Sequence, residues 1–141
     1  MVGMIVTGHG SFATGVTSGL RLLAGEPENY EAVDFLPEDS VISLTEKLKA
    51  AAERLSGCSG ILIFADLTGG SPFNVSIRMK LEGNGALEVI GGANLPSVLQ
   101  GYMARMAEDD VSVLAMDVLA AGKEAMVRFE ASGNDDDDYE E

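Results

Sequence analysis

Residues 2–11 read VGMIVTGHGS, and this stretch decides the fold class. The apolar run from Val2 to Val6 predicts a buried strand, because short, uninterrupted apolar runs are typical of parallel sheets. A helical period follows, and its apolar positions are Phe12, Val16, Leu20 and Leu23. Gly25 is expected to end that helix. The only histidine of the chain, His9, lies between the predicted strand and the predicted helix.

The alternation of strand and helix patterns continues along the chain. Apolar runs at 30–35, 61–65 and 87–90 predict further strands. Helices are expected after Ser40, from Ser71 with Ser71 as its N-cap, at 95–106 with Asn94 as its N-cap, and at 111–121 ending before Gly122. Residues 125–129 suit either more helix or a fifth strand. Four strand–helix repeats predict an α/β fold whose open, mostly parallel, doubly wound sheet has helices on both faces.

Length and composition bound the organisation of the chain. With 141 residues we expect one domain, residues 1–130, followed by a disordered acidic tail, residues 131–141. The net charge of −14 argues against nucleic acid as a partner. A single cysteine, Cys58, fits a reducing and therefore cytoplasmic location. The first apolar run has no basic residue before it, so we interpret it as a strand rather than a signal peptide.

Two loops are expected to meet at one edge of the sheet. Ligands of open parallel sheets bind beyond the carboxyl ends of the strands, where the strand order reverses. His9 follows the first predicted strand and Asp66 follows the third. If the strand order is 2-1-3-4, which is an assumption at this point, the two residues are neighbours. A carboxylate that accepts from one imidazole nitrogen fixes the tautomer and leaves the other nitrogen as a nucleophile, so we predict both residues as catalytic.

The surroundings of this pair suit a phosphoryl group. Two predicted helices begin there, and helix N-termini attract anions. None of the nine Lys and Arg residues falls in either loop, as expected for a carrier that passes its phosphoryl group on instead of holding it tightly. Hydroxyl groups and glycine backbone are the remaining donors. The predicted phosphoryl-binding residues are Gly10, Ser11, Thr68, Gly70 and Ser71.

Structural explanations of the same residues stay open. His9 also suits a turn or a packing role, and Asp66 also suits a cap of the following turn. The glycine spacing does not match a dinucleotide fingerprint, and the chain lacks a P-loop lysine. One histidine and scattered acidic residues give no convincing metal site, so we expect neither a metal nor a cofactor.

The motifs resemble the IIA component of the mannose-type (mannose, fructose and sorbose) bacterial sugar phosphotransferase system. The resemblance rests on His9-Gly10 with Ala13, on DLTGGSPFN at 66–74, and on GANLP at 92–96. It extends over nearly the whole expected domain. The GGSPFN run and the placement of the histidine are specific only in combination.

The resemblance implies a role for the protein. His9 would accept a phosphoryl group from the phosphohistidine of the carrier protein HPr and pass it to a IIB subunit, which serves the membrane IIC/IID permease. Asp66 matches the carboxylate that hydrogen-bonds the active histidine, whereas Thr68 falls where the family varies. The family has the strand order 2-1-3-4 and forms homodimers that exchange a short antiparallel C-terminal strand, which favours a strand at 125–129. No IIB segment follows the tail, so we expect a stand-alone IIA protein.

Two other functions stay open. A IIA-like subunit that donates phosphoryl groups to a dihydroxyacetone kinase shares the fold and the histidine, although GGSPFN fits the sugar system better. A non-catalytic flavodoxin-like binding module, with His9 as a turn residue, predicts no phosphorylation and indifference to His9→Gln. The identity of the sugar does not follow from the sequence, because a IIA subunit does not touch it.

Overall fold

A computed structural model describes residues 1–83 and 85–131 of the chain. Strands and helices alternate through these residues, as the sequence predicts. The elements are β1 (Gly3–His9), α1 (Phe12–Ala24), β2 (Tyr30–Phe35), α2 (Val41–Arg54), β3 (Ile61–Ala65), α3 (Ser71–Glu82), β4 (Leu87–Gly91), α4 (Leu95–Ala104) and α5 (Val111–Ala125).

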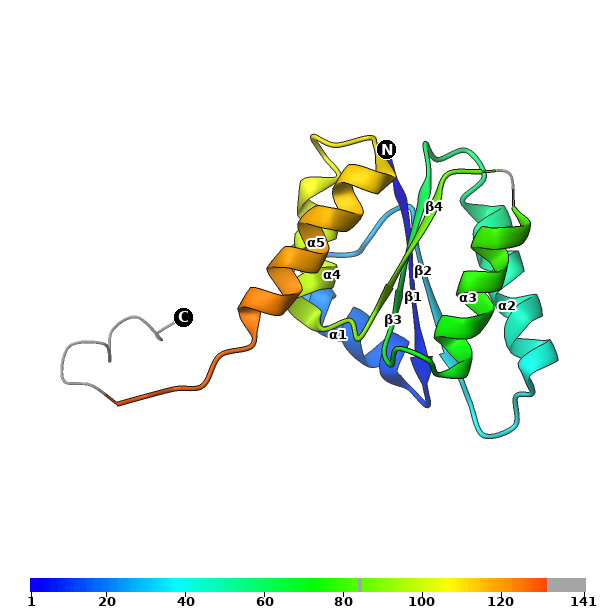
Figure 1. Ribbon diagram of the computed structural model, residues 1–141, viewed down its shortest axis with the longest axis horizontal. Coiled ribbons are helices and arrows are strands. Elements are labelled where there is room, and N and C mark those ends of the chain that lie inside the picture. The colour runs from blue at the N-terminus through cyan, green and yellow to red at the C-terminus, as the bar shows by residue number, and fades with distance from the viewer. Residues whose placement is uncertain (84, 132–141) are drawn as a thin grey trace.

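The four strands form one sheet in the order β2-β1-β3-β4, and each neighbouring pair is parallel. The assumed order 2-1-3-4 is therefore confirmed. Helices α1, α4 and α5 cover one face of the sheet, and α2 and α3 cover the other (Figure 1). The fold is the expected doubly wound α/β fold, and it brings the carboxyl ends of β1 and β3 together where the strand order reverses.

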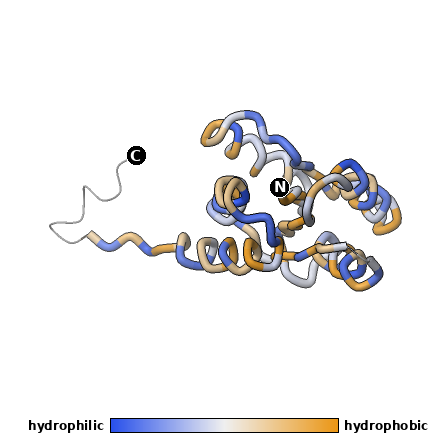
Figure 2. The backbone as a smooth tube through the Cα atoms, turned by 90° about the horizontal axis from the view of Figure 1, so that it is seen from above, coloured by the Kyte–Doolittle hydropathy of each residue, from blue (hydrophilic) through white to orange (hydrophobic). Residues whose placement is uncertain are grey.

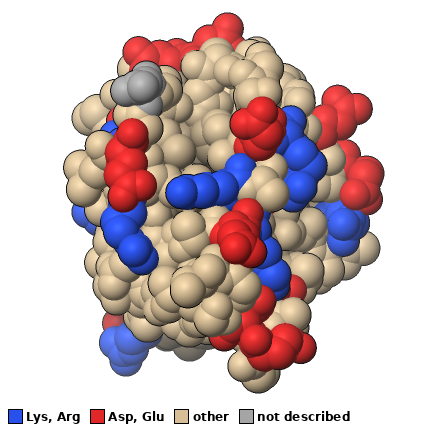
Figure 3. All heavy atoms as spheres, turned by 90° about the vertical axis from the view of Figure 1, so that its right-hand side faces the viewer, with Lys and Arg blue, Asp and Glu red and all other residues tan. Residues whose placement is uncertain are grey.

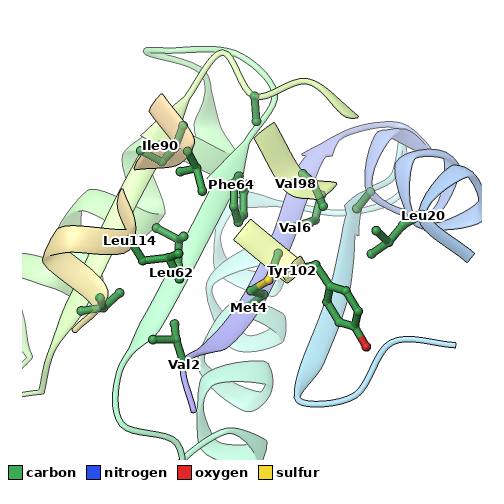
Figure 4. Close-up of a cluster of buried hydrophobic side chains, with 14 residues drawn as sticks. Val2, Met4, Val6, Leu20, Leu62, Phe64, Ile90, Val98, Tyr102 and Leu114 are labelled. Atoms are coloured by element: carbon green, nitrogen blue, oxygen red, sulfur yellow. The ribbon is translucent and has the colours of Figure 1, made fainter. Parts of the chain in front are cut away.

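The hydrophobic core has two halves because side chains alternate across the central strands. Met4, Val6 and Phe64 are buried against α1, α4 and α5 (Figure 4). Ile5 and Ile63 are buried against α2 and α3. Each such side chain contributes about 1.5–3 kcal/mol to the free energy of unfolding. Burial on both faces accounts for the uninterrupted apolar runs of β1 and β3.

The outer side of α2 and α3 bears much of the positive charge of the chain. Figure 3 shows Lys and Arg interspersed with Asp and Glu on this side of the molecule. Ion pairs join Lys47 to Asp39, Arg54 to Glu31 and Lys80 to Glu88. These three positive charges are therefore balanced by neighbouring carboxylates.

The end of α5 differs from the prediction. The helix continues past Gly122 to Ala125. A Cβ atom on Gly122 would lie only 3.0 Å from Cβ of Ser97, and Asn94 Nδ2 donates to the Gly122 carbonyl at 3.0 Å. The lack of a side chain at Gly122 therefore leaves room for the start of α4, and Gly122 does not end α5. The predicted end of α4 was also too late, since α4 ends at Ala104.

Residues 126–131 have no regular secondary structure in the single chain. Because Ala125 is the last residue of α5, a strand that begins at Ala125 is wrong at its first residue. The following segment leaves the body of the fold, and hydrophobic and hydrophilic positions alternate along it (Figures 1 and 2). Strand exchange requires a second chain and stays a prediction, as does the domain boundary at 130. Apart from residue 131, the predicted acidic tail lies outside the described residues.

Candidate active site

His9 and Asp66 occupy the carboxyl ends of the two central strands. His9 is the last residue of β1, so it belongs to the sheet and not to the following loop. Asp66 directly follows β3, and its backbone N–H donates to the Thr7 carbonyl at 3.2 Å. β1 and β3 pair in parallel as far as Thr7 and Ala65, so the sheet brings His9 and Asp66, which follow these residues, close together.

The Asp66 carboxylate binds His9 twice. Its Oδ2 accepts from the backbone N–H of His9 at 2.9 Å and lies 3.0 Å from Nδ1 of the ring, while Oδ1 lies 3.3 Å from the same nitrogen. A carboxylate only accepts, so we assign the proton of a neutral ring to Nδ1, which leaves the lone pair on Nε2. The His9 side chain is 46% exposed and that of Asp66 is 15% exposed. The His9 ring is therefore partly open to solvent.

Gly70 lies directly against the imidazole ring. A Cβ atom at this position would be 2.7 Å from Cε1 and 3.5 Å from Nε2 of His9. Gly70 is also the N-cap of α3, where the prediction named Ser71, and no side chain caps this helix. Ser71 and Pro72 open the helix instead. The N-terminus of α3 thus has backbone N–H groups that no side chain satisfies, next to the free nitrogen of the ring.

The start of α1 is different. The Asp34 carboxylate accepts from Thr14 N at 3.1 Å and from Thr14 Oγ1 at 2.9 Å. Ser11 is the N-cap of α1, and its side chain makes no capping bond. An anion therefore already lies at this N-terminus. The N-termini of α1 and α3 therefore differ in their charge balance. Asp34 already balances the positive end of α1, whereas the positive end of α3 can attract an anionic ligand.

Gly10 and Thr68 take up defined positions around the pair. Gly10 has a φ of 58°, which favours glycine, and its N–H donates to the Phe35 carbonyl at 2.8 Å. Thr68 lies against the end of β4, since the atoms nearest to a Cβ on Gly91 are Thr68 Oγ1 and carbons of the Phe73 ring. Gly10 therefore shapes the turn after His9, whereas Thr68 packs on the side of β4.

Sequence reasoning missed two residues at the end of β2. Asp34 caps α1, and the Phe35 ring contacts the His9 ring with centroids 5.8 Å apart and planes at 63°. The signal was available in the assumed strand order, because β2 is the other neighbour of β1 and His9 pairs with Phe35. Among the described residues, no group of three or more His, Cys, Asp and Glu side chains gathers as metal ligands do.

Fold and site together define a doubly wound α/β protein with a carboxylate-oriented histidine at the carboxyl edge of its sheet. Residues 3–118 match the model of the EIIA-man family, described as the PTS system fructose IIA component. The chain therefore belongs to this family, the mannose-type IIA components of the sugar phosphotransferase system (PTS). No helix in the described part of the chain is long and apolar enough to cross a bilayer.

Curated relatives support the same assignment. The chain is 30% identical over 130 residues to the PTS system mannose-specific EIIAB component of Escherichia coli K12, which covers 92% of this chain and 40% of that protein. It is 33% identical over 97 residues to the PTS system sorbose-specific EIIA component of Lacticaseibacillus casei, which covers 69% of each chain. The chain thus spans about 40% of the length of the mannose-specific relative.

Solved structures agree with the fold. The phosphotransferase system component EIIA of Streptococcus agalactiae superposes with a TM-score of 0.86 at 29% identity, covering 92% of this chain and 98% of that one. The mannose/sorbose specific IIA subunit of Enterococcus faecalis gives a TM-score of 0.79 at 26% identity, covering 92% and 96%. These similarities agree with the assignment of the chain to the PTS IIA family.

Proposed function

We propose that His9 carries a phosphoryl group from HPr to a IIB subunit. The observation that supports this most directly is the bond between Nδ1 of His9 and Asp66, which leaves Nε2 free on a half-exposed ring. The Nε2 lone pair attacks the phosphorus of the donor's phosphohistidine. The N–P bond to the donor breaks, and its electron pair returns to the donor's ring. The same exchange in the other direction transfers the group to the IIB subunit.

Asp66 has a second task in this proposal. Phosphorylation at Nε2 makes the imidazole more positive as long as Nδ1 keeps its proton. The carboxylate stabilises that charge and holds the Nδ1–H toward itself, so no proton has to move during transfer. Asp66 is thus an orienting and charge-stabilising group, not a proton acceptor.

The phosphoryl oxygens are assigned chiefly to the N-terminus of α3. Gly70 lets the ring approach this helix end, and Ser71 adds its N–H and hydroxyl groups. Gly10 shapes the turn beside the phosphoryl group, because its N–H already donates to the Phe35 carbonyl. Ser11 and Thr68 have smaller parts, because Ser11 starts the helix that Asp34 caps and Thr68 packs toward β4.

The edge around His9 suits a protein partner. Leu67 is 57% exposed in the loop after Asp66. Val41 and Ile42 begin α2, which starts at the same edge of the sheet, and they are 42% and 73% exposed. Exposed apolar side chains beside a reactive group are typical of transient docking surfaces. The site loops lack Lys and Arg, so HPr and IIB supply positive charge during transfer. The IIC/IID permease is served only through IIB, and the carrier works in the cytoplasm.

The protein is further proposed to form a homodimer through residues 126–130. Met126, Val127 and Phe129 are 83%, 70% and 55% exposed. A cavity of about 330 Å³ lies between the end of β4 and α5, where β4 has its open edge. A strand of a second chain that pairs with β4 would cover that edge and bury these side chains. Sedimentation equilibrium of the full chain and of a chain ending at residue 125 tests this, and a full chain that is monomeric at 100 μM contradicts it.

Phosphorylation itself is tested by intact-protein mass. Wild type and His9→Gln are incubated with phosphoenolpyruvate, enzyme I and HPr from one organism, and then with a IIB subunit. One acid-labile phosphoryl group on wild type, none on His9→Gln, and its loss when IIB is added are the expected results. A folded wild type that stays unmodified while HPr is phosphorylated contradicts the proposal.

A further inference from the structure

Phe35 faces His9 from the neighbouring strand. In the parallel register of β1 and β2, His9 and Phe35 are direct partners. Alternation places His9 on the same face as Ile5, and Phe35 packs with the core cluster that contains Ile5 and Val33. Both side chains therefore project on the α2–α3 side of the sheet, where their rings meet edge to face with centroids 5.8 Å apart.

The contacts of the His9 ring show what Phe35 adds. Asp66 holds Nδ1, but both carboxylate oxygens lie within 3.3 Å of that nitrogen, so the ring can swing about this point and keep a hydrogen bond. Gly70 limits the swing on the side of Cε1. Phe35 is the aromatic contact of the ring, and much of the remaining surface faces solvent. A hydrogen bond at one atom fixes the tautomer, whereas the direction of Nε2 depends on the groups around the ring.

We infer that Phe35 is a positioning residue for His9. Its ring blocks the swing of the imidazole away from α3 and so keeps Nε2 aimed at the N-terminus of that helix. Its backbone carbonyl accepts from Gly10 N at 2.8 Å and fixes the turn that follows the histidine. The effect on transfer rate rests on the proposed function, while the effect on ring orientation does not. Misplacement of a reacting atom by about 1 Å costs up to ~100-fold in rate, so loss of this wall has a measurable consequence.

Phe35→Ala tests the inference, and Val33→Ala is the matched control. Val33 lies on the same strand, is buried in the same cluster and pairs with Thr7 instead of His9 in the sheet register. Single-turnover transfer from phospho-HPr is expected to slow about tenfold in Phe35→Ala and to stay near wild type in Val33→Ala. Phe35→Leu restores most of the bulk and is expected to recover most of the rate.

Nuclear magnetic resonance of ¹⁵N-labelled His9 gives a readout that does not depend on phosphoryl transfer. The ring signals that decide are the nuclear Overhauser contacts between the His9 ring and Gly70, because loss of the Phe35 ring current alone shifts the ¹⁵N resonances. Phe35→Ala is expected to weaken these contacts, and Val33→Ala is not. Unchanged ring signals in Phe35→Ala, or equal slowing in the two alanine variants, overturn the inference. If wild type accepts no phosphoryl group, the proposed function fails, and the ring signals alone decide the role of Phe35.

Discussion

The two ends of the sheet each centre on one charged side chain, and they differ in how that charge is satisfied. At the amino end, Arg105 is 1% exposed and donates to the carbonyl oxygens of Val2 and Asn29, both at 3.0 Å, and to that of Glu28. The ring of Tyr102 lies 4.3 Å from the guanidinium carbon. Burial lowers the pKa of Arg105, while the nearby Tyr102 opposes this effect.

At the carboxyl end, Asp66 is the charged group and His9 is its only side-chain partner among the described residues. The carboxylate is mostly covered, but the ring that it holds is about half exposed. Fixed backbone carbonyls satisfy the charge of Arg105, whereas a side chain that can gain and lose charge satisfies that of Asp66. The amino end therefore stabilises the fold, and the carboxyl end is free to change its chemical state.

Arg105→Met is expected to have the largest effect of the substitutions that test this comparison. It removes the guanidinium donor from the carbonyl oxygens of Val2 and Glu28, at about 1–3 kcal/mol each, while the Asn29 oxygen keeps its bond from Met4 N, so the free energy of unfolding should fall by about 2–5 kcal/mol. Urea unfolding measures this change. Phosphoryl transfer per folded molecule should not change.

Arg54→Met is the control for Arg105→Met. Arg54 pairs with Glu31 on the surface and is 57% exposed, so its loss should cost less than about 1 kcal/mol. Equal destabilisation by the two variants would show that the carbonyl contacts of Arg105 contribute little.

Asp66→Asn tests the other end of the sheet. The amide keeps the shape of the carboxylate but loses its charge, and its NH₂ group can hold the ring in the wrong tautomer. We expect transfer from phospho-HPr to slow about 10²–10³-fold, with little change in stability. Rapid-quench kinetics measures the rate, and a rate within threefold of wild type contradicts the role given to Asp66.

Gly70→Ala tests how closely the ring must approach α3. Gly70 has a φ of −74°, so alanine fits the backbone and only the new methyl group, 2.7 Å from Cε1 of His9, has to be accommodated. The ring should be displaced and the transfer rate should fall about tenfold. Gly15→Ala adds the same group in α1 with no atom within 4 Å. It should leave the rate unchanged and raise stability by about 1 kcal/mol.

Asp39→Asn is expected to have the smallest effect. Hydrogen bonds from Lys47 and from the Leu36 backbone lower the pKa of Asp39 below its usual 3.8. A lowered pKa stabilises the fold above the unfolded value, and that contribution is lost as the pH falls below about 3.8. The difference in urea midpoint between pH 7 and pH 3 should therefore be slightly smaller in Asp39→Asn than in wild type.

Much of the fold followed from the sequence because its local signals agree. The apolar runs identified the strands, and the N-caps Ser40 and Asn94 are each part of a capping box in the structure. The pairing of His9 with Asp66 was also predictable, since two strand ends and a strand order suffice to place the two residues side by side. The family resemblance supplied that order.

Other features depend on contacts between distant segments. Arg105 is buried by carbonyl groups more than seventy positions away along the chain, and no local pattern predicts this. Gly122 reads as a helix terminator until the start of α4 is placed against it. The sequence pattern assigned Phe35 to a strand and indicated no further role for it. Its contact with the His9 ring depends on the pairing of β2 with β1.

The sharing of one carboxylate oxygen between the ring and the backbone of His9 has a spectroscopic consequence. Asp66 Oδ2 lies 2.9 Å from the backbone nitrogen of His9 and 3.0 Å from Nδ1. When the ring becomes more positive, it draws the oxygen more strongly, and the bond to the backbone N–H weakens. The backbone amide signal of His9 thus reports the state of the ring, so the proposed phosphorylation should be visible in real time without a label on the imidazole.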